Sequence, residues 1–205
     1  RDKSDSLFRA ALRKEWSLRA AVDVALARID EEEAERTART GVTRTRIVPI
    51  HNHGEMPPLG IGMVLSYAKA YEDGILDEHY SFRPDWVAAT RNPEELAPEP
   101  GIFLFSNYLW SHRQSIKVSE AIKAHSPHSV TIHGGPDTPG YLEDIKTYFA
   151  ANPHVDITVH GEGEVTTAEI LKALTGKVGN GPVDLSVLED VKGLSYRWGD
   201  STVHT

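Results

Sequence analysis

Short apolar runs alternate with segments of helical periodicity from residue 44 onward. The runs that we expect to form strands are 46–50, 78–82, 102–105, 129–132 and 155–159. The segments that we expect to form the intervening helices are 58–73, 112–125, 139–151 and 165–174. A strand–helix repeat of this kind produces parallel strands with helices on both faces of the sheet. The pattern therefore predicts an α/β fold, a flavodoxin-like (Rossmann-like) doubly wound sheet of five parallel strands.

The two ends of the chain follow other patterns. Apolar residues at helical spacing predict one long helix over residues 4–37, which needs a surface to pack against. Residues 176–183 are rich in glycine, and residues 191–204 read as a small β-hairpin with Gly199-Asp200 near its turn. We divide the chain into a helical extension at 1–41, an α/β domain at 42–176, and a linker with a hairpin at 177–205.

Composition narrows the function classes. The net charge of the 205-residue chain is −8, which argues against nucleic acid or an anionic membrane as the main partner. No apolar run is long enough to span a bilayer, and the first residues do not resemble a signal peptide, so the cytoplasm is the expected compartment. The absence of cysteine excludes disulfides, thiolate zinc sites and any iron–sulfur cluster held by this segment.

Three glycine-rich turns each follow a short apolar run or open a helix. They are Pro57-Pro58-Leu59-Gly60-Ile61-Gly62, Gly134-Gly135-Pro136 and Gly161-Glu162-Gly163-Glu164. Glycine lets a main chain approach a ligand closely, because no Cβ intervenes. Turns at successive strand ends line the crevice in which open α/β sheets bind their ligands. We expect these turns, with the polar segment Ser106-Asn107-Tyr108 and the neighbouring Trp110, to share one such crevice.

A nucleotide site is an alternative for such a fold, but the fingerprints are incomplete. The third glycine is replaced by Leu65 after Gly60-x-Gly62 and by Thr166 after Gly161-x-Gly163. The carboxylates of Glu162 and Glu164 would also repel a pyrophosphate. Trp110 is interpreted either as a core residue or as the wall of a site for a flat ligand.

Histidines offer few metal sites. His51 and His53 lie two residues apart after the first expected strand, where they read as surface-loop residues or as a two-histidine metal site. His133 and His160 precede glycine turns and are interpreted as buried, hydrogen-bonded core residues.

Taken together, the motifs resemble the cobalamin-binding domain of B12-dependent radical S-adenosylmethionine (SAM) enzymes. The resemblance covers residues 44–200 and includes a fifth motif, Gly193-Leu194-Ser195-Tyr196-Arg197, which is similar to the strand that leads into the catalytic barrel of that family. It implies cobalamin bound base-off, with its nucleotide tail between the Ser106 turn and the Gly134 turn. The implied cofactor-binding residues are Pro58, Leu59, Gly60, Ser106, Asn107, Tyr108, Trp110, Gly134, Gly135, Pro136, Gly161, Glu162, Gly163 and Glu164.

The resemblance also implies what this chain lacks. The family carries SAM and a [4Fe-4S] cluster on a C-terminal barrel with three cysteines, whereas this chain contains none. We therefore expect the chain to present cobalamin to a radical SAM domain of the same parent protein, most simply for methyl transfer, and not to be catalytic alone. The alternatives are a stand-alone corrinoid carrier or sensor, and a nucleotide-binding α/β domain.

The lower ligand of cobalt is a separate question. Other corrinoid proteins use an Asp-x-His-x-x-Gly motif, and His51 with Gly54 keeps part of it. Pro49 stands where the motif has its aspartate, the residue that orients and charges the imidazole. We therefore predict no metal ligand in this chain, with His51 as the alternative.

Overall fold

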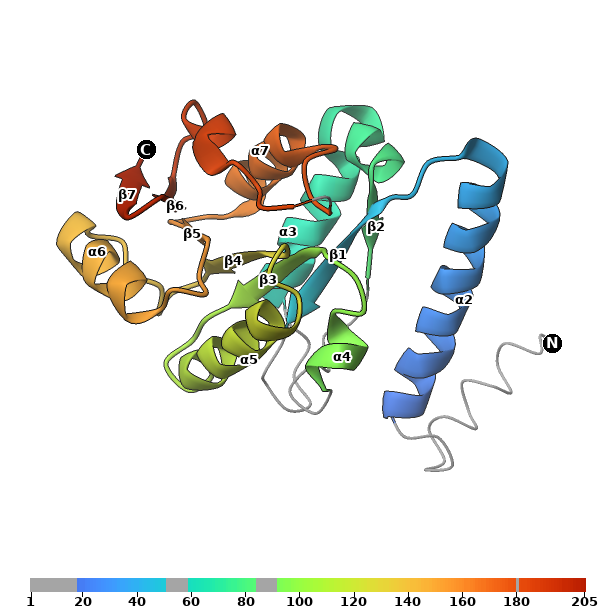
Figure 1. Cartoon of the computed structure of the whole chain (residues 1–205), viewed down its shortest axis with the longest axis horizontal. Helices are drawn as coiled ribbons and strands as arrows, with labels where there is room; N and C mark the ends of the chain where they lie inside the picture. Colours follow the sequence, from blue (N-terminus) through green and yellow to red (C-terminus); the bar gives the residue numbers. More distant parts are fainter. Residues whose placement is uncertain (1–17, 51–58, 84–91, 180) are drawn as a thin grey trace.

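The apolar runs assemble into one mixed sheet with helices on both faces (Figure 1). The computed structural model describes residues 18–50, 59–83, 92–179 and 181–205. The five expected strands form and are mutually parallel, in the order β2-β1-β3-β4-β5. Their bounds are β1 Thr45–Ile50, β2 Tyr80–Phe82, β3 Ile102–Ser106, β4 Val130–Gly134 and β5 Ile157–Val159.

The expected count of five strands is wrong for the sheet as a whole, because the described residues form seven: two antiparallel strands extend the five parallel ones. Strand β6 (Leu194–Trp198) pairs antiparallel with β5, and β7 (Ser201–His204) pairs antiparallel with β6. The side chains of Leu194 and Tyr196 are buried, so β6 contributes to the same core as the parallel strands. The C-terminal segment thus covers the edge that β5 would otherwise expose.

Side chains alternate between the two faces of the sheet, as the twofold period of a strand requires. One face packs against α3 (Leu59–Ala70) and α7 (Glu164–Leu174), as Figure 1 shows. The other packs against α4 (Pro93–Leu96) and α5 (His112–His125), and α6 (Leu142–Ala151) packs beside α5. Two short 3₁₀ helices, η1 (Tyr71–Glu78) and η3 (Leu185–Leu188), complete the described elements.

The N-terminal helix α2 (Leu18–Thr40) lies beside β2, at the edge of the sheet opposite β7 (Figure 1). Polar contacts attach it there: Asp30 pairs with Arg83 at 2.7 Å, Glu33 pairs with Arg44, and Arg36 Nη2 donates to the Glu78 carbonyl at 2.9 Å. The expected start of this helix at residue 4 lies outside the described residues. None of the described helices is both long and apolar enough to cross a bilayer.

Three imidazoles link the stability of this fold to pH. Burial lowers the pKa of His133, His154 and His160, most strongly for the fully buried His133. The unfolded chain binds these protons near pH 6.5 and the folded chain only at lower pH, so stability is lost as pH falls below about 6.5.

We expect the urea midpoint of unfolding to be lower at pH 5.5 than at pH 7.5. His133 alone contributes a slope of at most about 1.4 kcal/mol per pH unit, in the range between its folded and unfolded pKa values. Urea titrations of the wild type and of His133→Gln at both pH values test this, and the variant is expected to show the smaller pH dependence. A wild-type midpoint that does not move between the two pH values would contradict the assignment.

Candidate functional site

A cavity of about 220 Å³ lies at the carboxyl ends of β3, β4 and β5, between the sheet and the α3–α7 pair. This is the edge at which open α/β sheets bind ligands, next to the point where the strand order reverses between β1 and β3. The lining residues are Gly60, Ile61, Val64, Leu104, Phe105, Ser106, Tyr108, Ile132, Gly134, Gly135, Val159, Gly161, Glu162, Gly163, Glu164 and Thr167.

The floor of the cavity is apolar and its mouth is polar. Uncharged side chains of the sheet and of α3 form the floor. Ile61, Leu104, Ile132 and Val159 are buried, and Val64 is partly buried. The hydroxyls of Ser106 and Tyr108 and the carboxylates of Glu162 and Glu164 lie at the more exposed mouth. Among the described lining residues there is no lysine or arginine. The site therefore suits a neutral, largely apolar group better than a phosphate.

The structure brings most of the sequence-predicted residues to this cavity. Those that line it are Gly60, Ser106, Tyr108, Gly134, Gly135, Gly161, Glu162, Gly163 and Glu164. Leu59, Asn107, Trp110 and Pro136 are not among the lining residues. Pro58 and the alternative cobalt ligand His51 lie outside the described residues.

Asn107 supports the site from behind. Its side chain is fully buried, and its amide Nδ2 lies 3.2 Å from His133 Nδ1 and 3.1 Å from Thr138 Oγ1. Its main-chain N–H donates to the Gly134 carbonyl at 2.7 Å, which continues the β3–β4 ladder by one residue. The described contacts of Asn107 therefore join the two turns to each other.

Among the described glycines, Gly135 is the one at which an added Cβ would make the closest steric contact. Its φ is +96°, and a Cβ built on it would lie 2.6 Å from the carbonyl oxygen of Asn107. The sequence predicted close approach to a ligand at this turn, and the structure shows a close approach to the neighbouring main chain. Gly134 differs, because a Cβ there would meet only Val159, at 3.7 Å.

The rim beside the cavity is unusually apolar for an exposed surface. Leu59, Leu109 and Trp110 are 77%, 82% and 75% exposed. The Trp110 ring stacks on that of Tyr108, with centroids 5.1 Å apart and planes inclined by 15°. Trp110 is thus not a core residue, and together with Tyr108 it offers a flat aromatic surface at the mouth of the cavity.

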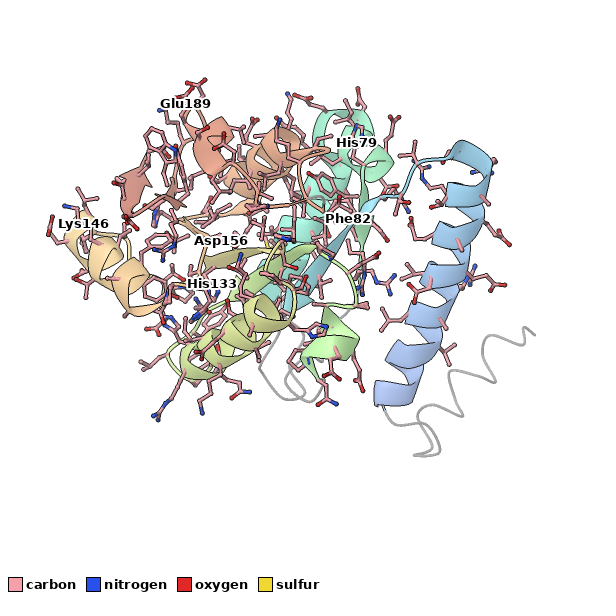
Figure 2. All side chains as sticks on the ribbon, viewed as in Figure 1. His79, Phe82, His133, Lys146, Asp156 and Glu189 are labelled. Atoms are coloured by element: carbon pink, nitrogen blue, oxygen red, sulfur yellow. The ribbon has the colours of Figure 1, made fainter. Side chains whose placement is uncertain are left out.

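Sequence reasoning missed the apolar floor. Leu104, Ile132 and Val159 are alternate residues of buried strands, and nothing in their types separates a cavity floor from ordinary core. The interpretation of His133 (labelled in Figure 2) as a buried, hydrogen-bonded residue is confirmed. Its Nε2 lies 3.0 Å from Ser119 Oγ, and its ring stacks on that of Phe105. His160 is half-buried, and its Nε2 lies 2.9 Å from Ser195 Oγ.

Comparison with known proteins agrees with the motifs. The chain is 32% identical over 116 residues to the cobalamin-dependent radical SAM methyltransferase TokK of Streptomyces tokunonensis. It is also 32% identical over 117 residues to the 2-(S-pantetheinyl)-carbapenam-3-carboxylate methyltransferase of Streptantibioticus cattleyicolor. Each match covers 56% of this chain and 16% of the relative, and no family model matches. The resemblance to the cobalamin-binding domain of a B12-dependent radical SAM enzyme is therefore confirmed.

The two adjacent glycines give a matched test of the geometry at the turn. Gly135→Ala is expected to destabilise the fold by about 1–3 kcal/mol, because the new Cβ meets the Asn107 main chain in a left-handed conformation. Gly134→Ala should change stability by less than about 1 kcal/mol, since its Cβ finds only ordinary contacts. Urea unfolding of both variants measures the difference, and equal stabilities would contradict the described packing.

Proposed function

We propose that this chain is the cobalamin-binding part of a B12-dependent radical SAM methyltransferase, and that the cavity holds the nucleotide tail of base-off cobalamin. The observation that carries the proposal is the apolar floor, which lies between the Ser106 turn and the Gly134-Gly135 turn and has no lysine or arginine among its described lining residues. The matches to two methyltransferases, one of them named as cobalamin-dependent, support the same function.

The residues present fit such a tail. Dimethylbenzimidazole is flat and largely apolar, so its burial against Ile61, Leu104 and Ile132 releases water from apolar surface on both partners. The hydroxyls of Ser106 and Tyr108 lie at the mouth, where the polar sugar and phosphate of the tail would leave the cavity. Glycines at positions 60, 134 and 163 leave room beside the floor that side chains would otherwise fill.

The corrin ring would then rest over the apolar rim. Leu59, Leu109 and Trp110 are exposed there, and a flat macrocycle would cover them. Bound cobalamin supplies a cobalt centre that accepts and donates a methyl group. The protein's part is to hold this centre in one orientation toward a reaction partner, which lowers the entropic cost of the encounter.

The remainder of the enzyme is also part of the proposal. The chain spans 16% of the length of its two relatives and contains no cysteine. We assign SAM and the [4Fe-4S] cluster to another part of the parent protein, to which this chain presents the cofactor. A stand-alone corrinoid carrier or sensor would share the cavity. A nucleotide-binding domain is disfavoured, because Glu162 and Glu164 are the charged groups of the described lining.

The chain is expected to bind one equivalent of hydroxocobalamin and to retain it through desalting, with a base-off absorption spectrum. The tail leaves cobalt because the cavity binds it.

We also predict that His51 does not bind cobalt, because Pro49 stands where the histidine motif has its aspartate. Electron paramagnetic resonance of the Co(II) form should therefore show no nitrogen splitting that is lost in His51→Ala. A folded chain that retains no corrinoid would refute the proposed function, and a base-on spectrum would refute the tail site.

Two glycines of α3 test the location of the tail. Gly60 lines the cavity, and a Cβ there would lie 3.7 Å from Tyr108 Oη, whereas Gly62 does not line it and has open space around it. Gly60→Leu should fill the cavity and weaken cobalamin binding at least tenfold, or about 1.4 kcal/mol. Gly62→Leu should bind like the wild type.

Both substitutions replace glycine in a helix by a better helix former, so a loss of stability is not expected to confound the comparison. Equilibrium dialysis or absorbance titration gives the two dissociation constants, and circular dichroism checks the fold. Equal affinities of the two variants would show that the tail binds elsewhere.

A further inference from the structure

A carboxylate, an imidazole and a phenol form a hydrogen-bonded chain beside the Gly134-Gly135 turn. His112, the first residue of α5, has its Nδ1 2.7 Å from Asp137 Oδ2 and its Nε2 3.0 Å from Tyr148 Oη. Asp137 belongs to the loop that follows β4, and Tyr148 belongs to α6. The chain therefore joins three separate segments at one imidazole, on the face of the sheet opposite the cavity.

The partners fix the direction of these hydrogen bonds. The Asp137 carboxylate accepts, so Nδ1 of His112 carries a hydrogen and donates it. Burial raises the pKa of Tyr148, so its phenol stays protonated and can donate to Nε2 of His112. A hydrogen bond to an ionised acceptor is stronger than a neutral one, so the contact between His112 and Asp137 is the stronger link.

Asn107 holds the same loop from its other side. Its carbonyl accepts from the Asp137 main-chain N–H at 3.2 Å, and its side-chain Nδ2 donates to Thr138 Oγ1 at 3.1 Å. The Thr138 N–H in turn donates to the Gly135 carbonyl at 3.0 Å, which closes the turn. The segment from Gly134 to Thr138 is thus tied to the end of β3 and, through Asp137, to α5 and α6.

We propose that His112, Asp137 and Tyr148 are positioning residues that hold the Gly134-Gly135 turn in the shape that forms the cavity wall. Gly134 and Gly135 line the cavity, whereas the three positioning residues do not. Loss of the His112–Asp137 link should let the turn move and weaken ligand binding that depends on that wall. This role toward a ligand rests on the proposed function, because the ligand assigned to the cavity is the nucleotide tail.

Three substitutions at His112 separate its two hydrogen bonds. The amide of His112→Asn occupies the place of Nδ1 and can still donate to Asp137, whereas that of His112→Gln occupies the place of Nε2 and can reach only Tyr148. His112→Phe keeps a ring but loses both bonds. Since Asp137 is the loop residue, the asparagine variant should resemble the wild type, and the glutamine and phenylalanine variants should not.

The first measurement needs no ligand. Hydrogen–deuterium exchange should be faster in the peptide that contains Asp137 and Thr138 in His112→Phe than in the wild type, and His112→Asn should restore the protection. The peptide that contains β5 (Ile157–Val159) is the internal control and should not change. Unchanged exchange at Asp137 and Thr138 in His112→Phe would overturn the proposal.

The second measurement separates positioning from general stability. Cobinamide carries the corrin but no nucleotide tail, so the turn should matter for cobalamin and not for cobinamide. We expect His112→Phe and His112→Gln to lose about tenfold in cobalamin affinity, or about 1.4 kcal/mol, with cobinamide affinity unchanged. His112→Asn should bind both corrinoids like the wild type.

The outcomes are distinct. Equal losses for the two corrinoids, or no loss for either, would overturn the positioning role. A wild-type chain that binds neither corrinoid would refute the proposed function, and with it the role toward the tail, while the exchange data would still decide whether His112 holds the turn.

Discussion

The architecture of the site depends on one main-chain contact, the approach of Gly135 to Asn107. Asn107 and Gly135 directly follow the adjacent parallel strands β3 and β4, and Gly135 adopts a left-handed conformation. A Cβ built on Gly135 would lie 2.6 Å from the carbonyl oxygen of Asn107. Only glycine permits this, and the contact lets Asn107 extend the β3–β4 ladder past the last sheet residue. The two turns therefore leave the sheet as one unit. A rigid edge of this kind is what allows the turns to form a wall.

Charge decides what that wall can bind. The carboxylates of Glu162 and Glu164 lie at the mouth, near the N-terminus of α7, whose dipole they partly neutralise. In nucleotide-binding sheets the same position serves to attract a pyrophosphate. Here the acidic residues occupy it, and the buried part of the lining is apolar apart from the hydroxyl of Thr167. The combination favours a neutral aromatic base and leaves any phosphate of the ligand to solvent or to residues beyond the described lining.

The sequence predicted the α/β class and most of the cavity turns, because both depend on local patterns. A continuous apolar run such as Ile102–Phe105 and a double glycine are visible without tertiary information. The number of strands was not predictable in the same way. Whether residues 194–204 form a separate hairpin or extend the sheet depends on the free edge of β5, which is a property of the assembled fold. The role of Asn107 was likewise hidden, since a buried amide and a ligand-binding amide look the same in a sequence.

In the proposed function, the two faces of the sheet have different roles. The α3–α7 face leaves a cavity, because glycines replace larger side chains along its walls. The α5–α6 face carries the polar chain through His112, which links the loop after β4 to both helices. The ligand and the polar chain thus act on opposite sides of the same turn. The loop over residues 134–140, with three glycines and two prolines, has few side chains of its own to define its shape. Its shape must come from neighbours, and the side away from the ligand is where neighbours can bind it without filling the cavity.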